Sequence, residues 1–185
     1  FAKKNKLEFY RGPLEDVLER FYLCSKKYNF DAIIRVTADD PFKDPEVILK
    51  ALTIFRNNNY DYVSNTIKPT YPEGIDIEIF SFEALEIAHR EAKLDSERLH
   101  VTPYIWKNNN KFNIHNFEDS SDNSQIRLTC DYKEDLDYLN KIYEYFDDDN
   151  FSYTDIIEII KEKNIKHARH IDRNEGYLKD LSKEK

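Results

Sequence analysis

The sequence predicts a single α/β domain whose mostly parallel sheet is covered by helices on both faces. Residues 32–36 (Ala-Ile-Ile-Arg-Val) form a short apolar run with β-branched side chains, which is typical of a buried parallel strand. The apolar positions of residues 14–22 recur at i, i+3, i+4 and i+7, the spacing of an amphipathic helix. Segments of these two kinds alternate along the chain, as they do in sheets with crossover helices.

The remaining helices and strands are predicted from the spacing of apolar residues, from helix-capping residues and from residues that interrupt helices or strands. Pro45 suits the first turn of a helix, where no N–H donor is needed. Ile75, Ile77 and Ile79 alternate as on one strand face, and Ser81 suits the N-cap of the next helix. Strands are expected at residues 7–10, 32–36, 60–66, 75–80, 111–116 and 125–130. Helices are expected at residues 14–22, 45–57, from 82 onward, 100–106, 131–146 and 152–163.

Length, composition and charge exclude several classes of protein. The chain has 185 residues, 40% hydrophobic and 35% charged, which indicates a globular protein with a real core. A net charge of −8 argues against nucleic acid as a partner, because phosphate binding needs a clustered basic face. No apolar run reaches the roughly 18 residues of a membrane span. Cys24 and Cys130 form no C-x-x-C pair, so a reducing cytoplasm is the expected location.

The two ends of the chain carry further expectations. The sequence contains no methionine, and its first residues resemble the end of a helix, so we expect it to begin within a longer domain. Residues 1–171 are predicted to form one α/β domain. Residues 172–185 are polar and are expected to be a loosely held tail.

Two adjacent carboxylates follow the strand at residues 32–36. Asp39 and Asp40 lie in a turn closed by Pro41, at the carboxyl end of that strand, where open α/β sheets bind their ligands. Two carboxylates in a tight turn suit a Mg²⁺ ion that also holds the phosphates of a nucleotide. The alternative is that one of them caps the following turn or helix.

Other carboxylates allow two interpretations each. Asp131 follows the strand at 125–130, but with Glu134 three positions later it also fits a helix N-cap in a capping box. Asp76 and Glu78 share the strand face opposite the isoleucines, which is either solvated or lines a cleft.

Two basic side chains are further candidates. Arg98 and His100 suit an anionic substrate, or simply the start of a surface helix. The sequence contains no P-loop, G-x-S-x-G or H-E-x-x-H motif, and its three glycines form no phosphate cradle.

Segments along nearly the whole chain resemble, in order, the motifs of one family. Residues 11–20 match R-G-x-x-x-D-V-L-x-R, residues 35–45 resemble R-I-T-G-D-C-P-x-x-D-P, and residues 61–65 match D-Y-V-S-N. Residues 72–78 match P-x-G-x-D-x-E, residues 96–105 resemble S-E-R-E-H-V-T-P-Y-I, residues 127–136 resemble R-x-T-V-D-x-P-E-D-L, and residues 173–177 also fit. In these segments the chain is similar to the spore-coat polysaccharide cytidylyltransferases (SpsF-like), relatives of the CMP-sialate and CMP-Kdo synthetases.

The resemblance implies a Rossmann-like nucleotide-diphospho-sugar transferase fold and the reaction of CTP with a sugar acid, giving a CMP-sugar and pyrophosphate. It implies that Asp39 and Asp131 are catalytic carboxylates that hold Mg²⁺ or Mn²⁺. It places four side chains against the sugar, namely Asp76, Glu78, Arg98 and His100. Arg35 and Arg127 either join the site or brace the strand ends. Relatives are often homodimers.

The chain departs from the family pattern at three places. Ala38 stands for the usual glycine, Asp40 for cysteine, and Tyr132-Lys133 for Xaa-Pro. The family's first strand and its Gly-rich nucleotide loop do not occur in the chain, so we expect it to be a weak or inactive catalyst as given. Two other hypotheses stay open: a glycosyltransferase of related fold, which would favour D-x-D over Asp39-Asp40, and a non-catalytic sugar-binding protein.

Overall fold

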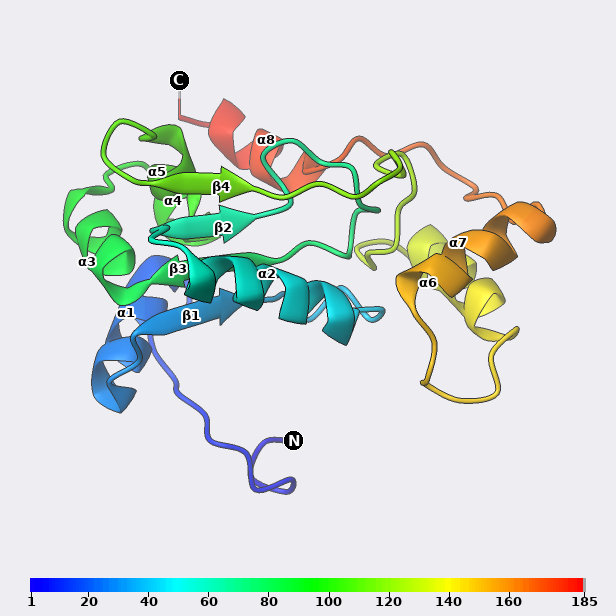
Figure 1. Cartoon of the computed structure of the whole chain (residues 1–185), viewed down its shortest axis with the longest axis horizontal. Helices are drawn as coiled ribbons and strands as arrows, with labels where there is room; N and C mark the ends of the chain where they lie inside the picture. Colours follow the sequence, from blue (N-terminus) through cyan, green and yellow to red (C-terminus); the bar gives the residue numbers. More distant parts are fainter. Residues whose placement is uncertain (185) are drawn as a thin grey trace.

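A four-stranded sheet between two layers of helices forms the body of the molecule (Figure 1). The structure is a computed structural model that describes residues 1–184. The strands are β1 (Ala32–Arg35), β2 (Tyr62–Ser64), β3 (Glu78–Ser81) and β4 (Ile114–Asn116). The helices are α1 (Val17–Tyr28), α2 (Pro45–Asn57), α3 (Phe82–Glu91), α4 (Asp95–His100), α5 (Pro103–Lys107), α6 (Lys133–Tyr143), α7 (Tyr153–Glu162) and α8 (Glu175–Ser182).

The sheet is mixed, with strand order β1-β3-β2-β4. β3 pairs antiparallel with β1 and with β2, while β2 pairs parallel with β4, so β1, β2 and β4 run in one direction. The expectation of a mostly parallel sheet therefore holds for strand direction but is wrong for the pairings of β3. The physical reason is the connection between β2 and β3, residues 65–77, which contains no helix. Parallel neighbours usually need a helical crossover.

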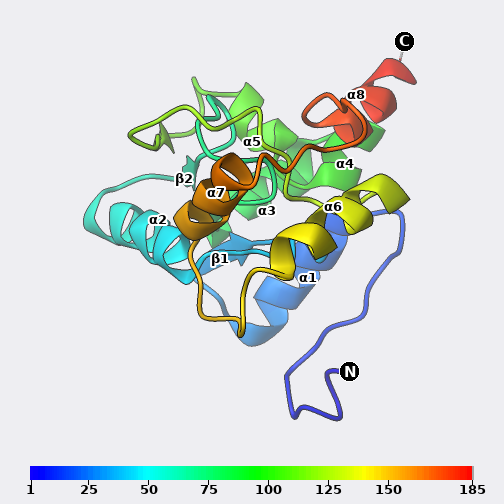
Figure 2. The ribbon, with the colours of Figure 1, turned by 90° about the vertical axis from the view of Figure 1, so that its right-hand side faces the viewer.

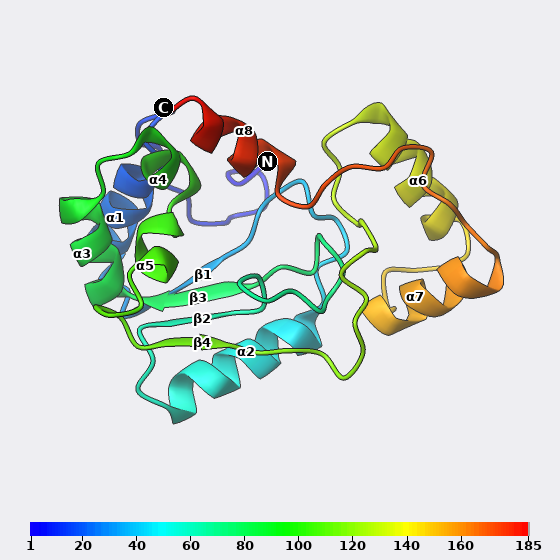
Figure 3. The ribbon, with the colours of Figure 1, turned by 90° about the horizontal axis from the view of Figure 1, so that it is seen from above.

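Both faces of the sheet are covered, as predicted. Val63 and Ile79 pack with α2 in one buried cluster, whereas Tyr62 and Phe80, their neighbours along the strands, pack with α1, α3 and α5 in the other. Figure 3 shows the sheet edge-on between α2 and the helices of the opposite face. The alternation at Ile75, Ile77 and Ile79 is also real, since all three side chains are fully buried in the first cluster.

Local caps explain why several boundaries were predictable. α2 has the predicted bounds because Pro45 occupies its first turn and the carboxylate of Asp44 accepts a hydrogen bond from the N–H of Glu46 (2.8 Å). Ser81 caps α3 by accepting from the N–H of Ala84 (3.0 Å), as expected.

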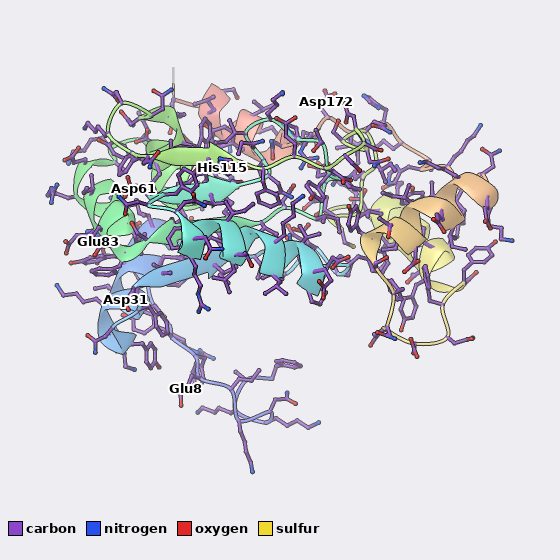
Figure 4. All side chains as sticks on the ribbon, viewed as in Figure 1. Glu8, Asp31, Asp61, Glu83, His115 and Asp172 are labelled. Atoms are coloured by element: carbon purple, nitrogen blue, oxygen red, sulfur yellow. The ribbon has the colours of Figure 1, made fainter. Side chains whose placement is uncertain are left out.

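Two predicted strands are absent from the described residues. Residues 7–10 have no strand pairing and belong to an exposed N-terminal segment that extends away from the body (Figure 2); Glu8, labelled in Figure 4, lies on it. Residues 125–130 make only one isolated parallel bridge, between Glu73 and Arg127. Gly74 permits this close approach: its φ is +100°, and a Cβ there would lie 2.7 Å from the carbonyl of Leu128.

The C-terminal segment is packed, so the expectation of a loosely held tail is wrong for residues 173–184. It follows Asp172, labelled in Figure 4, and forms α8 beside α4 (Figure 3). His100 bonds the carboxylate of Asp180 (3.0 Å), and the hydroxyl of Ser96 donates to Glu184 (3.0 Å). In residues 1–184, no helix combines the length and apolar character that crossing a membrane requires.

Candidate active site

A cavity of about 470 Å³ opens at the carboxyl end of β1. Its wall combines the turn after β1, the loop from β2 to β3, the junction of α4 with α5, the segment before α6, and the start of α8. Seven of the nine residues singled out from the sequence line it: Arg35, Asp39, Asp40, Asp76, Glu78, His100 and Asp131. Arg98 and Arg127 lie outside the lining.

A backbone hydrogen bond holds the two strand-end turns together. The N–H of Cys130 donates to the carbonyl of Asp39 (2.8 Å), and the hydroxyl of Thr129 donates to the same oxygen (3.4 Å). Asp131, the next residue, therefore lies at the same part of the cavity as Asp39. Both carboxylates are exposed to solvent, and in the described part of the chain no residue donates to the carboxylate of Asp39. The fold thus joins two acidic turns that are 92 positions apart in numbering.

Arg127 lies behind Asp131 and fixes its carboxylate. Its guanidinium donates to Asp131 (2.5 Å), to Glu73 (2.8 Å) and, through two nitrogens, to Asp135 (2.8 and 3.0 Å). The side chain of Arg127 is only 9% exposed. Of the two alternatives for Arg127, the geometry favours bracing.

Asp135, which the sequence did not single out, is the carboxylate that starts α6. The N-cap is Tyr132, and Asp135 accepts from the N–H groups of Asp131 and Tyr132 (both 2.9 Å). The capping box built on Asp131 and Glu134 is therefore wrong by one position. Burial alone would raise the pKa of Asp135, but hydrogen bonds from Arg127 and from the two N–H groups lower it to about 2.

Glu78 forms the buried floor of the cavity. It accepts from the guanidinium of Arg35, the hydroxyl of Tyr62 (2.6 Å) and the hydroxyl of Thr102 (2.6 Å). Burial opposes the charge on Arg35, but the carboxylate of Glu78 outweighs burial and raises the pKa of Arg35. Burial, reinforced by Glu78, raises the pKa of Tyr62 well above its usual value. These contacts make Glu78 and Arg35 a fixed, neutralised pair.

Asp76 lies in a ring of charged groups within the cavity. Its carboxylate accepts from Arg173, and its carbonyl accepts from the ammonium of Lys43 (2.5 Å). Lys43 also pairs with Asp40 (2.8 Å), whose other partner is the hydroxyl of Thr37 (2.8 Å). Burial raises the pKa of Asp76 to about 6 against the opposing effect of the two cations. Asp76 therefore titrates near pH 6.

A strained turn places His100 and Thr102 on the cavity wall. Val101 between them has φ 73° and ψ −56°, and the N–H of Thr102 donates to the carbonyl of His100 (2.9 Å). This is a classic γ-turn, which is rare and strained for a β-branched residue. Such a strained conformation persists only where the surrounding packing holds it in place. Strained residues of this kind cluster at functional sites.

Arg98 is held away from the cavity. It donates to the carboxylate of Asp16 (2.7 Å) and to the carbonyls of His89 (3.2 Å) and Ala92 (3.4 Å). These contacts tie α4 to the start of α1 and to the end of α3. The geometry offers no support for Arg98 as a sugar-binding residue.

The cavity also contains residues that the sequence reading did not select. Among them are Lys43, Thr102, Trp106, Arg173 and Tyr177. Arg173 and Tyr177 do lie in a family-like segment, which was the available signal, whereas Lys43 carried none.

The charge of the cavity favours a bound cation. Six carboxylates line it, against the three cations of Arg35, Lys43 and Arg173. Each cation is already paired, whereas Asp39 is not. Within residues 1–184 no group of three or more His, Cys, Asp or Glu side chains is arranged to hold a metal. Asp39 and Asp131 would therefore supply two carboxylates, as Mg²⁺ sites that also use substrate phosphates do.

Comparison with known proteins gives consistent matches. A family model described as Cytidylyltransferase matches residues 2–178. An uncharacterized protein of Methanocaldococcus jannaschii is 38% identical over 173 residues, covering 91% of this chain and 69% of that protein. Spore coat polysaccharide biosynthesis protein SpsF of Bacillus subtilis is 30% identical over 146 residues, covering 76% of this chain and 59% of SpsF.

A solved structure adds the fold. The structure of a cytidylyltransferase from Leptospira borgpetersenii serovar Hardjo-bovis superposes with a TM-score of 0.87 at 34% identity, covering 93% of this chain and 74% of that one. A Rossmann-like α/β sheet with a cavity at the strand ends is consistent with a nucleotidyltransferase fold. The chain belongs to the cytidylyltransferase family. The family and the fold class expected from the motifs are thereby confirmed.

Proposed function

We propose that the protein transfers the cytidylyl group of CTP to a sugar acid, with Asp39 and Asp131 holding a Mg²⁺ or Mn²⁺ ion. The observation that carries this proposal is the 2.8 Å hydrogen bond from the N–H of Cys130 to the carbonyl of Asp39, which brings the two acidic turns to one part of the cavity. The family supports nucleotidyl transfer, and the match to SpsF favours a sugar for a surface polysaccharide as acceptor.

In the proposed reaction a hydroxyl oxygen of the sugar acid attacks the α-phosphorus of CTP. The new O–P bond forms as the bond to the β-phosphate breaks, pyrophosphate leaves with the electron pair, and the hydroxyl proton passes to solvent. A divalent ion supplies neutralisation of phosphate charge when bound.

The chain's own residues orient the groups that react. Arg127 holds the carboxylate of Asp131 in one direction, and the Thr129 and Cys130 contacts hold the turn of Asp39. Catalysis of this kind consists mostly of positioning and charge stabilisation. Asp76 and His100 face the cavity where the acceptor would lie, and the fixed pair of Arg35 and Glu78 forms its floor.

Pyrophosphate release from CTP, measured for the full-length gene product with a panel of sugar acids and Mg²⁺ or Mn²⁺, tests the proposal. Asp39→Asn and Asp131→Asn should each lower the rate at least about 100-fold, because each removes a charged ligand, while circular dichroism stays unchanged. Asp149→Asn, at an exposed loop position, is the matched control and should keep full activity. A chelator should abolish the activity, and added Mg²⁺ should restore it.

Several results would contradict this function. Absence of pyrophosphate with every acid would exclude the cytidylyltransferase, and transfer from a finished nucleotide-sugar would indicate the glycosyltransferase instead. Sugar binding without either reaction would indicate the non-catalytic protein.

We also propose that the protein is located in the cytoplasm, consistent with free Cys24 and Cys130. We expect it to form a homodimer, which analytical sedimentation would measure.

A further inference from the structure

The wall of the cavity formed by the C-terminal segment carries two buried donors without partners. In the described part of the chain, neither Nε of Arg173 nor the hydroxyl of Tyr177 makes a hydrogen bond, although both atoms are inaccessible to water. Both residues line the cavity. A buried polar group left unpaired is costly, and native proteins seldom retain one without a reason such as a missing ligand.

The surroundings hold both side chains in place and leave these donors free. The other two nitrogens of Arg173 donate to the carbonyl of Tyr71 (3.1 Å) and to the carboxylate of Asp76. The ring of Tyr177 packs edge-on against His100 (5.2 Å between centroids) and Trp106 (5.9 Å). Both side chains are therefore ordered before any ligand arrives, which lowers the entropy cost of binding, and a ligand reaches the two covered donors once the groups around them shift.

The helix that carries Tyr177 is fastened at both ends across the cavity. At its start, the hydroxyl of Tyr132 donates to Glu175 (2.6 Å), and the N–H of Asn174 donates to Glu73 (3.0 Å). Near its end, Asp180 accepts from His100 (3.0 Å). α8 thus reaches from the segment next to Asp131 to the helix α4, and its first turn forms part of the cavity wall.

An anion needs such donors here, because carboxylates outnumber cations in the cavity lining. Asp40 and Glu78 already take the charges of Lys43 and Arg35. The guanidinium of Arg173 is also paired, with Asp76, but unlike the other two cations it keeps a spare buried N–H, and arginine is well suited to carboxylates. A tyrosine hydroxyl adds a second donor from a rigid aromatic ring.

We propose that Arg173 and Tyr177 recognise the acceptor, with the Nε–H of Arg173 and the hydroxyl of Tyr177 donating to the carboxylate of the sugar acid. This assignment deepens the proposed function and rests on it for the identity of the acceptor. It makes the start of α8 and the residue Arg173 just before it the segment that selects an acidic sugar over a neutral one.

Calorimetric titration of the protein with the panel of sugar acids, beginning with sialic acid, tests the assignment without requiring turnover. Tyr177→Phe should raise the Kd of the acid about tenfold, since it removes one hydrogen bond to a charged group. The same variant should unfold at the same denaturant concentration or a higher one, because the lost hydroxyl has no partner in the free protein. Tyr143→Phe, whose hydroxyl bonds Asp149 outside the cavity, is the matched control and should leave the Kd unchanged.

Two changes test whether the guanidinium of Arg173 recognises the charge of the carboxylate. Arg173→Gln removes the positive charge from the protein, and the methyl ester of the same acid removes the negative charge from the ligand. The substitution should raise the Kd of the acid at least about tenfold and leave the Kd of the ester nearly unchanged. In turnover assays both variants should raise the KM of the acid while leaving the KM of CTP alone. Equal Kd values for Tyr177→Phe and the unsubstituted protein, or equal losses for acid and ester, overturn the assignment, and so does binding of no acid at all. Acid binding with these changes but no pyrophosphate would leave the assignment standing and contradict the proposed function instead.

Discussion

Arg127 and Asp135 form a buried two-point ion pair, with Nε 2.8 Å from Oδ1 and Nη2 3.0 Å from Oδ2. The carboxylate of Asp135 is fully buried and also accepts from His167 (2.9 Å). Nη2 of Arg127, which donates to Oδ2 of Asp135, also donates to the carboxylate of Asp131 (2.5 Å). The pair therefore connects the core to one of the two proposed metal ligands.

Asp135→Asn should destabilise the fold and weaken the metal site together. The variant leaves Arg127 with one charged partner fewer in a buried place, which costs on the order of 3 kcal/mol in the free energy of unfolding. Asp131 should lose its fixed orientation, so that more Mg²⁺ is needed for half-maximal pyrophosphate release. Urea unfolding and a Mg²⁺ titration measure the two effects.

The neighbouring Glu134→Gln is the control for this prediction. Glu134 is exposed in the first turn of α6, so its variant should change the free energy of unfolding by less than about 0.5 kcal/mol. If the two variants behave alike, Asp135 does not have the role described.

Gly74→Ala should destabilise the protein by at least about 2 kcal/mol. The position requires positive φ, and the new Cβ would collide with the backbone of Leu128. Gly176→Ala is the matched control: it meets no atom within 4 Å and lies in α8, so it should be neutral or stabilising by up to about 1 kcal/mol. Denaturant unfolding compares the two, and equal midpoints would contradict the close approach at Gly74.

Asp76 should make the stability depend on pH between about 4 and 6. Its pKa is raised from 3.8 to about 6, so in this window the folded chain binds a proton that the unfolded chain has released. The contribution of Asp76 to the free energy of unfolding therefore falls as pH rises, by roughly 2 kcal/mol from pH 4 to pH 7.

Unfolding of Asp76→Asn at both pH values isolates this effect. Relative to the unsubstituted protein, the variant should be more stable at pH 7 than at pH 4 by that amount. Asp172→Asn, whose carboxylate is 83% exposed, should instead follow the unsubstituted protein. Parallel pH curves for Asp76→Asn and the unsubstituted protein would show that Asp76 does not carry the shift.

Features set by neighbouring residues were predictable from the sequence. α2 begins at Pro45 because its cap, Asp44, is the adjacent residue, and the isoleucines before and within β3 bury one face because their alternation is local. The direction of β3 was not predictable in this way. Residues 65–77 are long enough for either connection, and only the pairing with β1 and β2 decides between them.

The site shows the same division. Asp39 and Asp131 were found because each follows a strand or strand-like segment, and the family motifs paired them. Asp135 and Arg173 depend on contacts with residues 8 and 97 positions away, which no local pattern reveals. Arg98 suited an anion by residue type, yet Asp16, 82 positions away, takes its charge.

The placement of α8 bears on how the protein is made. The cavity is lined by residues from Arg35 to Leu178, so its two sides are synthesised at opposite ends of the described chain. Leu178 must leave the ribosome before the wall of the cavity can be complete, and the long-range contacts that complete it are slow to form. A nascent chain can pair its strands first, but it acquires the complete cavity only after nearly all of these residues have been translated.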